Sequence, residues 1–147
     1  FLTSIRSKEN LIFDGAIGDV SVNRIPTQQE IDDMLIAWYI VMNVRSNGIV
    51  FVKDGTTISV GTGQQERIGA VEQAIAKAKQ KGHSLANSVM ASDAFFPSRD
   101  SIDAIAKENV TAIIYPGGSI NDIEIIKAAN EHNIALAITG ERCFAHH

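Results

Sequence analysis

The glycine-rich stretch GTGQQERIG, residues 61–69, joins a predicted strand to a predicted helix. Backbone N–H groups in such a turn can receive an anion. Arg67 lies in the first turn or two of that helix, where the helix dipole disfavours a cation. We therefore expect Arg67 to face an anion. The alternative is a plain tight turn, because Glu66 occupies the third glycine position of a dinucleotide fingerprint and the Lys-Ser/Thr pair of a P-loop is missing.

Other candidate binding residues also lie beside predicted strand ends. Arg99 and Arg142 each lie next to such an end, where the ligands of open α/β sheets collect. Asn47 directly precedes a strand in VRSNGI, and its amide can pair with a base-like edge or serve ordinary turn chemistry. The loop YPGGSIND, residues 115–122, can hold a phosphate, or its two glycines can simply supply positive φ angles.

The stretch ASDAFFPSRD, residues 91–100, places two adjacent phenylalanines and a proline at the end of a predicted buried strand. Apolar rings in a loop leave surface exposed to water unless something covers them. Phe95 and Phe96 therefore either fill the core or face a ligand.

The four histidines and the single cysteine form no metal-binding motif. The spacings His-x-Glu, Cys-x-x-Cys and His-Glu-x-x-His are missing, which disfavours a metal-dependent hydrolase or a zinc deaminase. A Ser–His–Asp triad has no nucleophile elbow to support it. The sequence thus shows no strong general base of its own.

Hydrophobic periodicity predicts the elements that must position these residues. Thr27 and Glu30 have capping-box spacing at a helix start, and Asp54-Gly55 marks a hairpin between two β-branched runs. Gly82 fits the position after a helix, and Ser119 with Asp122 repeats the capping spacing. The expected helices cover about 27–42, 64–81, 101–107 and 121–132, and the expected later strands cover 88–94, 110–116 and 134–139.

The alternation of apolar strands with helices in the second half favours parallel strands covered on both faces. We expect an α/β protein, a three-layer α/β/α sandwich with a mixed, largely parallel sheet. Residues 1–26 are expected to form an irregular lead-in.

Composition narrows the classes of function. The chain has 147 residues, which suits one domain, and a net charge of −4, which argues against a broad nucleic-acid footprint. The longest apolar run, MLIAWYIVM, is about half of a membrane span. Cys143 is the only cysteine, so an internal disulfide cannot form and a cytoplasmic location is expected.

Five motifs in order resemble one known family. SNGIVFVKDG, GTGQQERI, ASDAFFPSRD, YPGGS and TGERCFAHH are similar to the C-terminal half of the AICAR transformylase domain of the bifunctional AICAR transformylase/IMP cyclohydrolase family. The resemblance covers nearly the whole chain, including PTQQEIDDMLIAWYIV, and implies one C-terminal subdomain over residues 1–147. It also implies a cytidine-deaminase-like fold without the zinc site.

The family transfers a formyl group from 10-formyltetrahydrofolate to the carboxamide-bearing nucleotide AICAR in purine biosynthesis. The resemblance implies nucleotide contacts at Asn47, Arg67, Phe95, Arg142 and Phe144, with Arg142 near the phosphate. It implies a folate side lined by Ile68, Pro97 and Asp100. It further implies a monovalent cation, such as K⁺, near Asp93 and the backbone around Ala145, and a homodimer.

The chain departs from the family pattern in three respects. Ser98 stands where many relatives have an aromatic residue, so one wall of the folate pocket is expected to be more open. The catalytic Lys-His pair belongs to an earlier subdomain, and Lys81-Gly82-His83 is not that motif. The cyclohydrolase domain is also missing from this sequence. We therefore expect formyl transfer to require a further subdomain, and the alternative is a non-catalytic nucleotide- and folate-binding or regulatory domain.

Overall fold

The computed structural model describes residues 16–17 and 20–140, and its elements follow the expected alternation. A small antiparallel pair, β1 (Ala16–Ile17) and β2 (Val20–Ser21), lies within the lead-in that the sequence had indicated as irregular. The first half then contains α2 (Gln28–Val41), β3 (Ile49–Lys53), β4 (Thr56–Gly61) and α3 (Arg67–Gln80). The second half contains β5 (Val89–Ser92), α4 (Asp100–Ala106), β6 (Ala112–Tyr115), α5 (Asp122–Glu131) and β7 (Ala135–Ile138).

The central sheet has the strand order β4-β3-β5-β6-β7. The pairs β4–β3 and β3–β5 are antiparallel, whereas β5–β6 and β6–β7 are parallel. The mixed sheet of the expected α/β class is therefore confirmed, with its parallel part in the second half of the chain. Helices α4 and α5 supply the crossover connections that parallel neighbours require.

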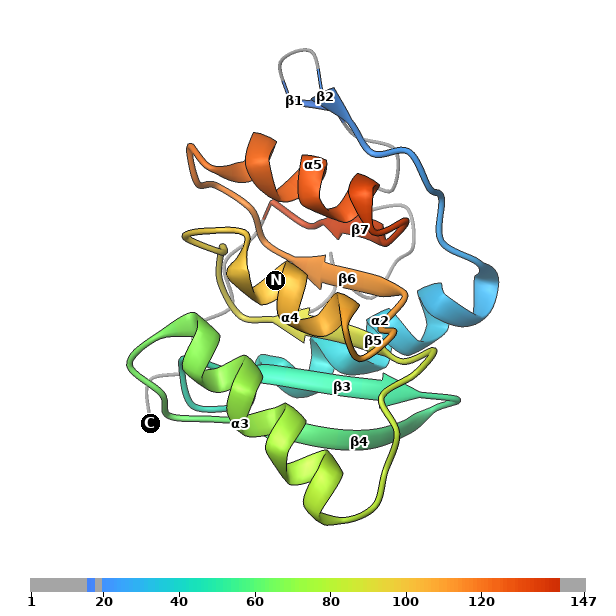
Figure 1. The fold of residues 1–147 in the computed structure, drawn as a ribbon, viewed down its shortest axis with the longest axis vertical. Coiled ribbons are helices and arrows are strands. Elements are labelled where there is room, and N and C mark those ends of the chain that lie inside the picture. The colour runs from blue at the N-terminus through green and yellow to red at the C-terminus, as the bar shows by residue number, and fades with distance from the viewer. Residues whose placement is uncertain (1–15, 18–19, 141–147) are drawn as a thin grey trace.

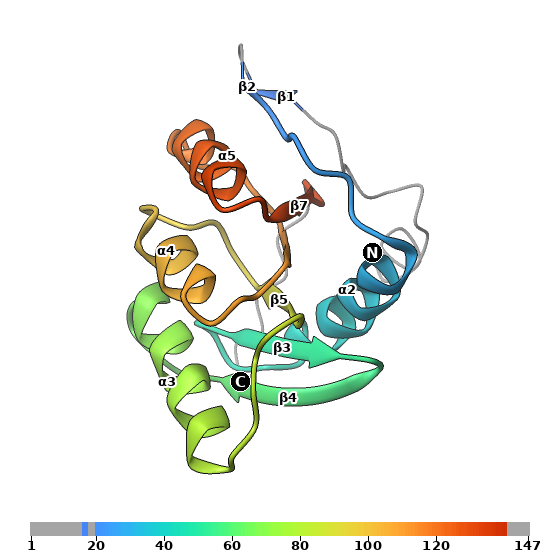
Figure 2. The same cartoon turned by 45° about the vertical axis from the view of Figure 1, so that its right-hand side comes forward.

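Helices cover both faces of the sheet, which gives three layers (Figures 1 and 2). Helix α2 lies on one face, and α3, α4 and α5 lie on the other. Because side chains alternate along a strand, Val50 and Val52 pack with α2 while Ile49 and Phe51 pack on the opposite side. None of the helices within the described residues is long and apolar enough to cross a membrane.

Local signals explain most element boundaries. Thr27 and Glu30 form the expected capping box at the start of α2. Asp54 and Gly55 have φ angles of 50° and 76°, as the two-residue hairpin turn between β3 and β4 requires. Gly82, with φ of 72°, follows the end of α3 as expected.

Two expected helix starts differ from the structure. Helix α3 begins at Arg67 rather than near Gln64, and the intervening residues form a loop. Helix α5 begins at Asp122, with Asn121 rather than Ser119 as the residue before it. The Asp122 carboxylate nevertheless accepts a hydrogen bond from the Ser119 backbone N–H at 3.2 Å. This is one of the two hydrogen bonds of a capping box.

The sheet topology brings three distant segments to one edge. Ile49, at the start of β3, pairs with Gly61 at the end of β4 and with Ser92 at the end of β5. The residues just before β3 and just after β4 and β5 must therefore lie together at this edge.

Candidate functional site

A cavity of about 510 Å³ lies at this edge of the sheet. Its lining comes from the loop before β3, the start of α3, the loop after β5 and the start of α4. The residues are Asn47, Gln65, Glu66, Arg67, Ile68, Ala94, Phe95, Pro97 and Asp100.

Six of the residues predicted to contact nucleotide or folate lie within the described part of the chain, and all six line this one cavity. They are the nucleotide-side residues Asn47, Arg67 and Phe95 and the folate-side residues Ile68, Pro97 and Asp100. The remaining two, Arg142 and Phe144, lie outside the described residues. The structure therefore brings together residues that are as many as 53 positions apart, while their roles in binding stay predictions.

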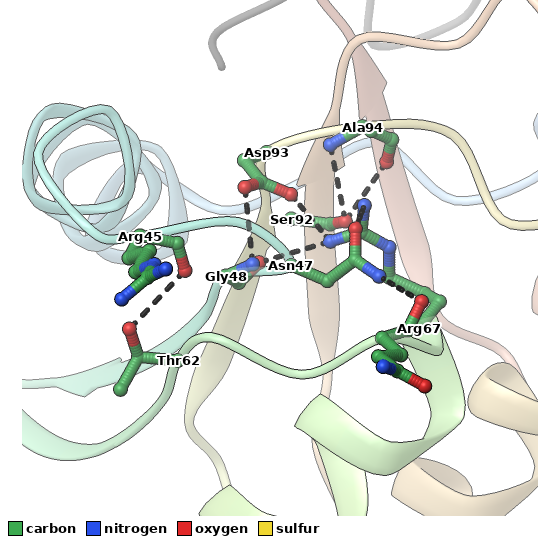
Figure 3. Close-up of polar contacts among 9 residues, drawn as sticks. Arg45, Asn47, Gly48, Thr62, Arg67, Ser92, Asp93 and Ala94 are labelled. Carbon is green, nitrogen blue, oxygen red and sulfur yellow. Dashed lines mark hydrogen bonds and ion pairs between the residues drawn. The ribbon is translucent and has the colours of Figure 1, made fainter. Parts of the chain in front are cut away.

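Arg67, which lines the cavity, is the centre of a hydrogen-bond network (Figure 3). Its Nη1 donates to a carboxylate oxygen of Asp93 and, at 3.2 Å, to the backbone oxygen of Gly48. Its Nη2 donates to Asn47 Oδ1 at 2.9 Å. Arg67 is only 6% exposed and Asp93 is fully buried, so their charges compensate each other away from water. The anion that Arg67 faces in this structure is thus a carboxylate of the same chain.

The Asn47 side chain is held from two sides. Its oxygen accepts from Arg67, and its Nδ2 donates to the backbone oxygen of Gln65 at 2.9 Å. A primary amide can accept two hydrogen bonds and donate two, so one acceptor and one donor position remain on Asn47. Because Asn47 is half-buried and lines the cavity, this pair of positions is suited to a ligand's amide or heterocyclic edge.

Asp93 was also expected to lie near a monovalent cation. Its two carboxylate oxygens accept from Arg67 Nη1 and, at 3.0 Å, from the Gly48 backbone N–H. The other expected cation contact, Ala145, lies outside the described residues, so the cation stays a prediction. Among the described residues, no cluster of three or more His, Cys, Asp or Glu side chains could hold a metal ion.

The adjacent phenylalanines divide between the cavity and the core. Phe95 is half-buried and lines the cavity, whereas Phe96 is fully buried. The Phe96 ring packs against Tyr115, with 5.2 Å between ring centroids and 43° between the ring planes. Phe96 therefore fills the core and Phe95 faces the cavity, while the contact of Phe95 with a nucleotide stays a prediction.

The YPGGSIND loop is organised around Asp122. Gly117 and Gly118 have φ angles of 75° and 100°, and the Gly118 backbone N–H donates to Asp122 Oδ2 at 2.8 Å. The Tyr115 hydroxyl donates to Asp122 Oδ1 at 3.2 Å. Burial, and next the charge of Asp122, raise the pKa of Tyr115 above its ordinary value, so this hydroxyl stays protonated. The turn interpretation of the two glycines is supported, since an internal carboxylate takes the place that a phosphate would need.

Arg99 binds carboxylates of α4 and α5 and does not face the cavity. It binds Asp103 at 3.0 Å and Glu131 at 2.5 Å, and it is not among the cavity residues. Its hydrogen bond, followed by that of His132, lowers the pKa of Asp103 to about 2. Hydrogen bonding to Arg99 likewise lowers the pKa of Glu131. Arg99 therefore joins α4 to α5 rather than serving the cavity.

Sequence reasoning missed several residues of the site. Gln65, Glu66 and Ala94 line the cavity, and each lies inside a motif that the sequence had already singled out. Gly48, for which no role was predicted, and Asp93, which was expected only near a cation, both accept hydrogen bonds from Arg67. The motif around Arg67 carries no local signal for this pairing, because Asp93 lies 26 positions away in the sequence.

Comparisons with known proteins identify the family of the chain. Residues 5–77 match the family model described as AICARFT/IMPCHase bienzyme. Over 127 residues, the chain is 50% identical to the bifunctional purine biosynthesis protein PurH of Aquifex aeolicus (strain VF5) and 48% identical to that of Persephonella marina (strain DSM 14350 / EX-H1). The chain is a PurH-family domain.

The match covers 86% of this PurH-family domain but only 25% of each of these relatives. The chain thus spans about a quarter of the length of the curated proteins it matches. Purine biosynthesis is the process that their names give.

Solved structures with a similar fold are deaminases. The dCMP deaminase from the cyanophage S-TIM5 superimposes with a TM-score of 0.53 and 16% identity, over 76% of the PurH-family domain and 98% of the deaminase chain. A diaminohydroxyphosphoribosylaminopyrimidine deaminase/5-amino-6-(5-phosphoribosylamino)uracil reductase from Thermotoga maritima gives a TM-score of 0.52 and 21% identity, over 72% and 34% of the two chains. At such identities the likeness concerns the fold alone, and it confirms the expected cytidine-deaminase-like class.

Proposed function

We propose that this PurH-family domain binds AICAR and a reduced folate and serves formyl transfer from 10-formyltetrahydrofolate to AICAR. In this function the protein acts in purine biosynthesis in the cytoplasm and forms a homodimer. Turnover requires a further subdomain that carries the Lys-His pair. The observation that carries the proposal is the convergence of three nucleotide-side and three folate-side residues on one cavity.

The cavity has the chemistry that such ligands require. A flat heterocycle suits apolar walls such as Phe95, Ile68 and Pro97, with a few fixed polar groups to orient it. The amide of Asn47 offers one donor and one acceptor position, which matches a carboxamide. The Asp100 carboxylate can accept hydrogen bonds from the amino group of a pteridine ring.

The start of α3 favours an anionic ligand at the same cavity. Arg67 and Ile68 contribute the first backbone N–H groups of a 14-residue helix, and such groups attract negative charge. The Arg67 charge is compensated by Asp93, so the nucleotide phosphate is assigned to Arg142 rather than to Arg67.

Formyl transfer requires the weakly nucleophilic amine of AICAR to be oriented and the leaving nitrogen of the folate to be protonated. Asn47 and Phe95 would contribute the orientation. The proton transfer is assigned to a further Lys-His-bearing subdomain. A second candidate function follows from that dependence: a binding or regulatory domain that retains both ligands without turnover.

Titration calorimetry and a formyl-transfer assay on the purified 147-residue chain separate these functions. We expect AICAR to bind, and we expect Asn47→Ala to weaken binding by roughly tenfold, because one or two hydrogen bonds are lost. Arg142→Ala should weaken it further through the phosphate. Turnover by the chain alone would contradict the need for a second subdomain.

Arg99→Ala provides the matched control, because Arg99 is an arginine that lies outside the cavity. Unchanged AICAR affinity in this variant, beside weaker binding by the cavity variants, supports the site. Failure of the unmodified chain to bind either AICAR or 10-formyltetrahydrofolate would refute the proposed function.

A further inference from the structure

The buried carboxylate of Asp93 has no part in the ligand contacts proposed above. It is fully buried, it binds Arg67 Nη1 on one oxygen, and it receives the Gly48 backbone N–H on the other. Gly48 follows Asn47 directly, so Asp93 holds both the arginine and the backbone of the loop that carries the half-buried amide.

Arg67 presents little of itself to a ligand. Its side chain is 5% exposed, and its two terminal nitrogens donate to Asp93, to the Gly48 oxygen and to Asn47 Oδ1. Its Nε, also buried, has no hydrogen-bond partner among the described residues. The guanidinium therefore acts mainly as a bridge from Asp93 to Asn47, and Asn47 is the member of the group with substantial exposure.

We propose that Asp93 is a positioning residue, which fixes the Asn47 amide in the cavity by way of Arg67. The guanidinium fork fixes which atom of the Asn47 side chain is the oxygen, since only the oxygen can accept from Nη2. The Gln65 carbonyl then takes one N–H of the amide. The cavity is thereby presented with one acceptor and one donor in a defined order, which selects a carboxamide-like edge of a ligand. This inference rests on the proposed function for the identity of that ligand.

The order matters for specificity. If Arg67 were not held, the Asn47 amide could rotate by half a turn and exchange its donor and acceptor positions. A ligand whose donor and acceptor fit one order would then place its own N–H group against the N–H group of Asn47. Asp93, which the cavity lining does not include, would in this way control affinity without contacting the ligand.

Asp93→Asn is the direct test, with Asp33→Asn as its matched control. Asp33 is another buried carboxylate, 2% exposed, and it accepts backbone N–H groups of Asp54 and Gly55 at the far end of the β3–β4 hairpin. Both variants place an amide N–H against a backbone or guanidinium donor. Only Asp93→Asn alters the support of Arg67.

The two readouts are titration calorimetry with AICAR and ¹⁵N NMR of the Asn47 Nδ2 and Arg67 Nε signals without ligand. We expect Asp93→Asn to lower AICAR affinity by at least tenfold and to shift or broaden both signals. Asp33→Asn should change AICAR affinity by less than twofold and leave both signals in place, whatever it does to the unfolding midpoint.

A double variant keeps the test valid if Asp93→Asn folds poorly. Arg67→Met combined with Asp93→Asn removes both charges together, so no uncompensated charge stays buried and Gly48 keeps an amide oxygen as acceptor. If Asp93 acts through Arg67, the double variant binds AICAR no more weakly than Arg67→Met alone.

Additive losses of affinity in the double variant would overturn the inference. An Asp93→Asn variant with unchanged AICAR affinity or unchanged Asn47 signals would overturn it as well. Altered signals in Asp93→Asn, in a chain whose unmodified form does not bind AICAR, would refute the proposed function while the positioning of Asn47 stands.

Discussion

Phe95 and Phe96 are neighbours in the chain, yet their surroundings make different demands on the same ring. Phe96 is fully buried and packs against Tyr115, while Phe95 is half-buried at the cavity. Truncating a buried ring leaves a void that the tightly packed interior fills only in part. At the residue scale, stability and binding can therefore be separated within one dipeptide.

The prediction is that Phe96→Ala lowers the free energy of unfolding by about 3–5 kcal/mol. Phe95→Ala should cost much less stability and should instead weaken AICAR binding. Urea unfolding followed by circular dichroism measures the first effect, and calorimetry with AICAR measures the second. Equal losses of stability in the two variants would contradict the division of roles described above.

Much of this site could be anticipated from residue types. The polar and aromatic residues beside strand ends, Asn47, Arg67 and Phe95, do line one cavity. The partner of Arg67 could not be read from its motif, because Asp93 lies 26 positions away and comes close only through the pairing of β3 with both β4 and β5. The pairing of Arg99 with Glu131 has no local signal either, since Glu131 lies in α5, 32 positions away.

At the scale of elements, close packing of α3 on β4 fixes the start of the helix that carries Arg67 and Ile68. A Cβ atom added at Gly61, in β4, would lie 2.1 Å from the backbone oxygen of Ala70 in α3. Such an overlap with backbone can be relieved only if the strand and the helix move apart. A glycine in a strand commonly marks this kind of close backbone approach.

Gly61→Ala is therefore expected to lower the free energy of unfolding by about 1–3 kcal/mol and to weaken AICAR binding as α3 shifts. The control is Gly69→Ala within α3, where an added Cβ meets nothing closer than 3.6 Å. That variant should be neutral or more stable by up to about 1 kcal/mol, because alanine is the better helix former. Chemical unfolding of both variants measures the difference, and a destabilised Gly69→Ala beside an unaffected Gly61→Ala would contradict the packing argument.

The ion pairs of Arg99 join α4 to α5 and make this junction sensitive to acid. The folded-state pKa of Asp103, about 2, lies below its ordinary value of 3.8. A lowered pKa contributes stability that is fully present above pH 3.8 and is lost as the pH falls through about 2. Because the Asp103 side chain is 39% exposed, solvent and salt screen this contribution.

We predict that Asp103→Asn flattens the loss of stability between pH 4 and pH 2. Thermal unfolding across this range measures the slope for the unmodified chain and for the variant. Glu124→Gln, which removes an exposed carboxylate on α5, should leave the slope unchanged. Added salt should reduce the difference between the unmodified chain and Asp103→Asn, and a difference that persists undiminished in high salt would contradict a screened ion pair.

At the scale of the whole molecule, the class of fold followed from pattern alone, whereas the strand order did not. Apolar strands that alternate with helices indicate an α/β sandwich, and the capping and hairpin signals mark its elements. The order β4-β3-β5-β6-β7 depends on which strand β3 joins after the hairpin. The packing of helices on the two faces of the sheet decides which strand pairs with β3. No local motif in the sequence indicates that pairing.

The two cores lie on opposite faces of one sheet, so they are expected to unfold together. Strand β3 contributes Phe51 to one core and Val52 to the other, and Trp38 of α2 is buried on the side opposite α3. As the only tryptophan, Trp38 reports on the face away from α3. We predict that its fluorescence and the far-ultraviolet circular dichroism give coincident thermal transitions.

AICAR at about 100 times its dissociation constant should stabilise the chain by about 2.7 kcal/mol and move both midpoints upward by roughly 5–10 °C. The same concentration of ribose is the control. A Trp38 midpoint that stays in place while the dichroism midpoint rises would show that the face bearing α2 unfolds separately from the ligand site.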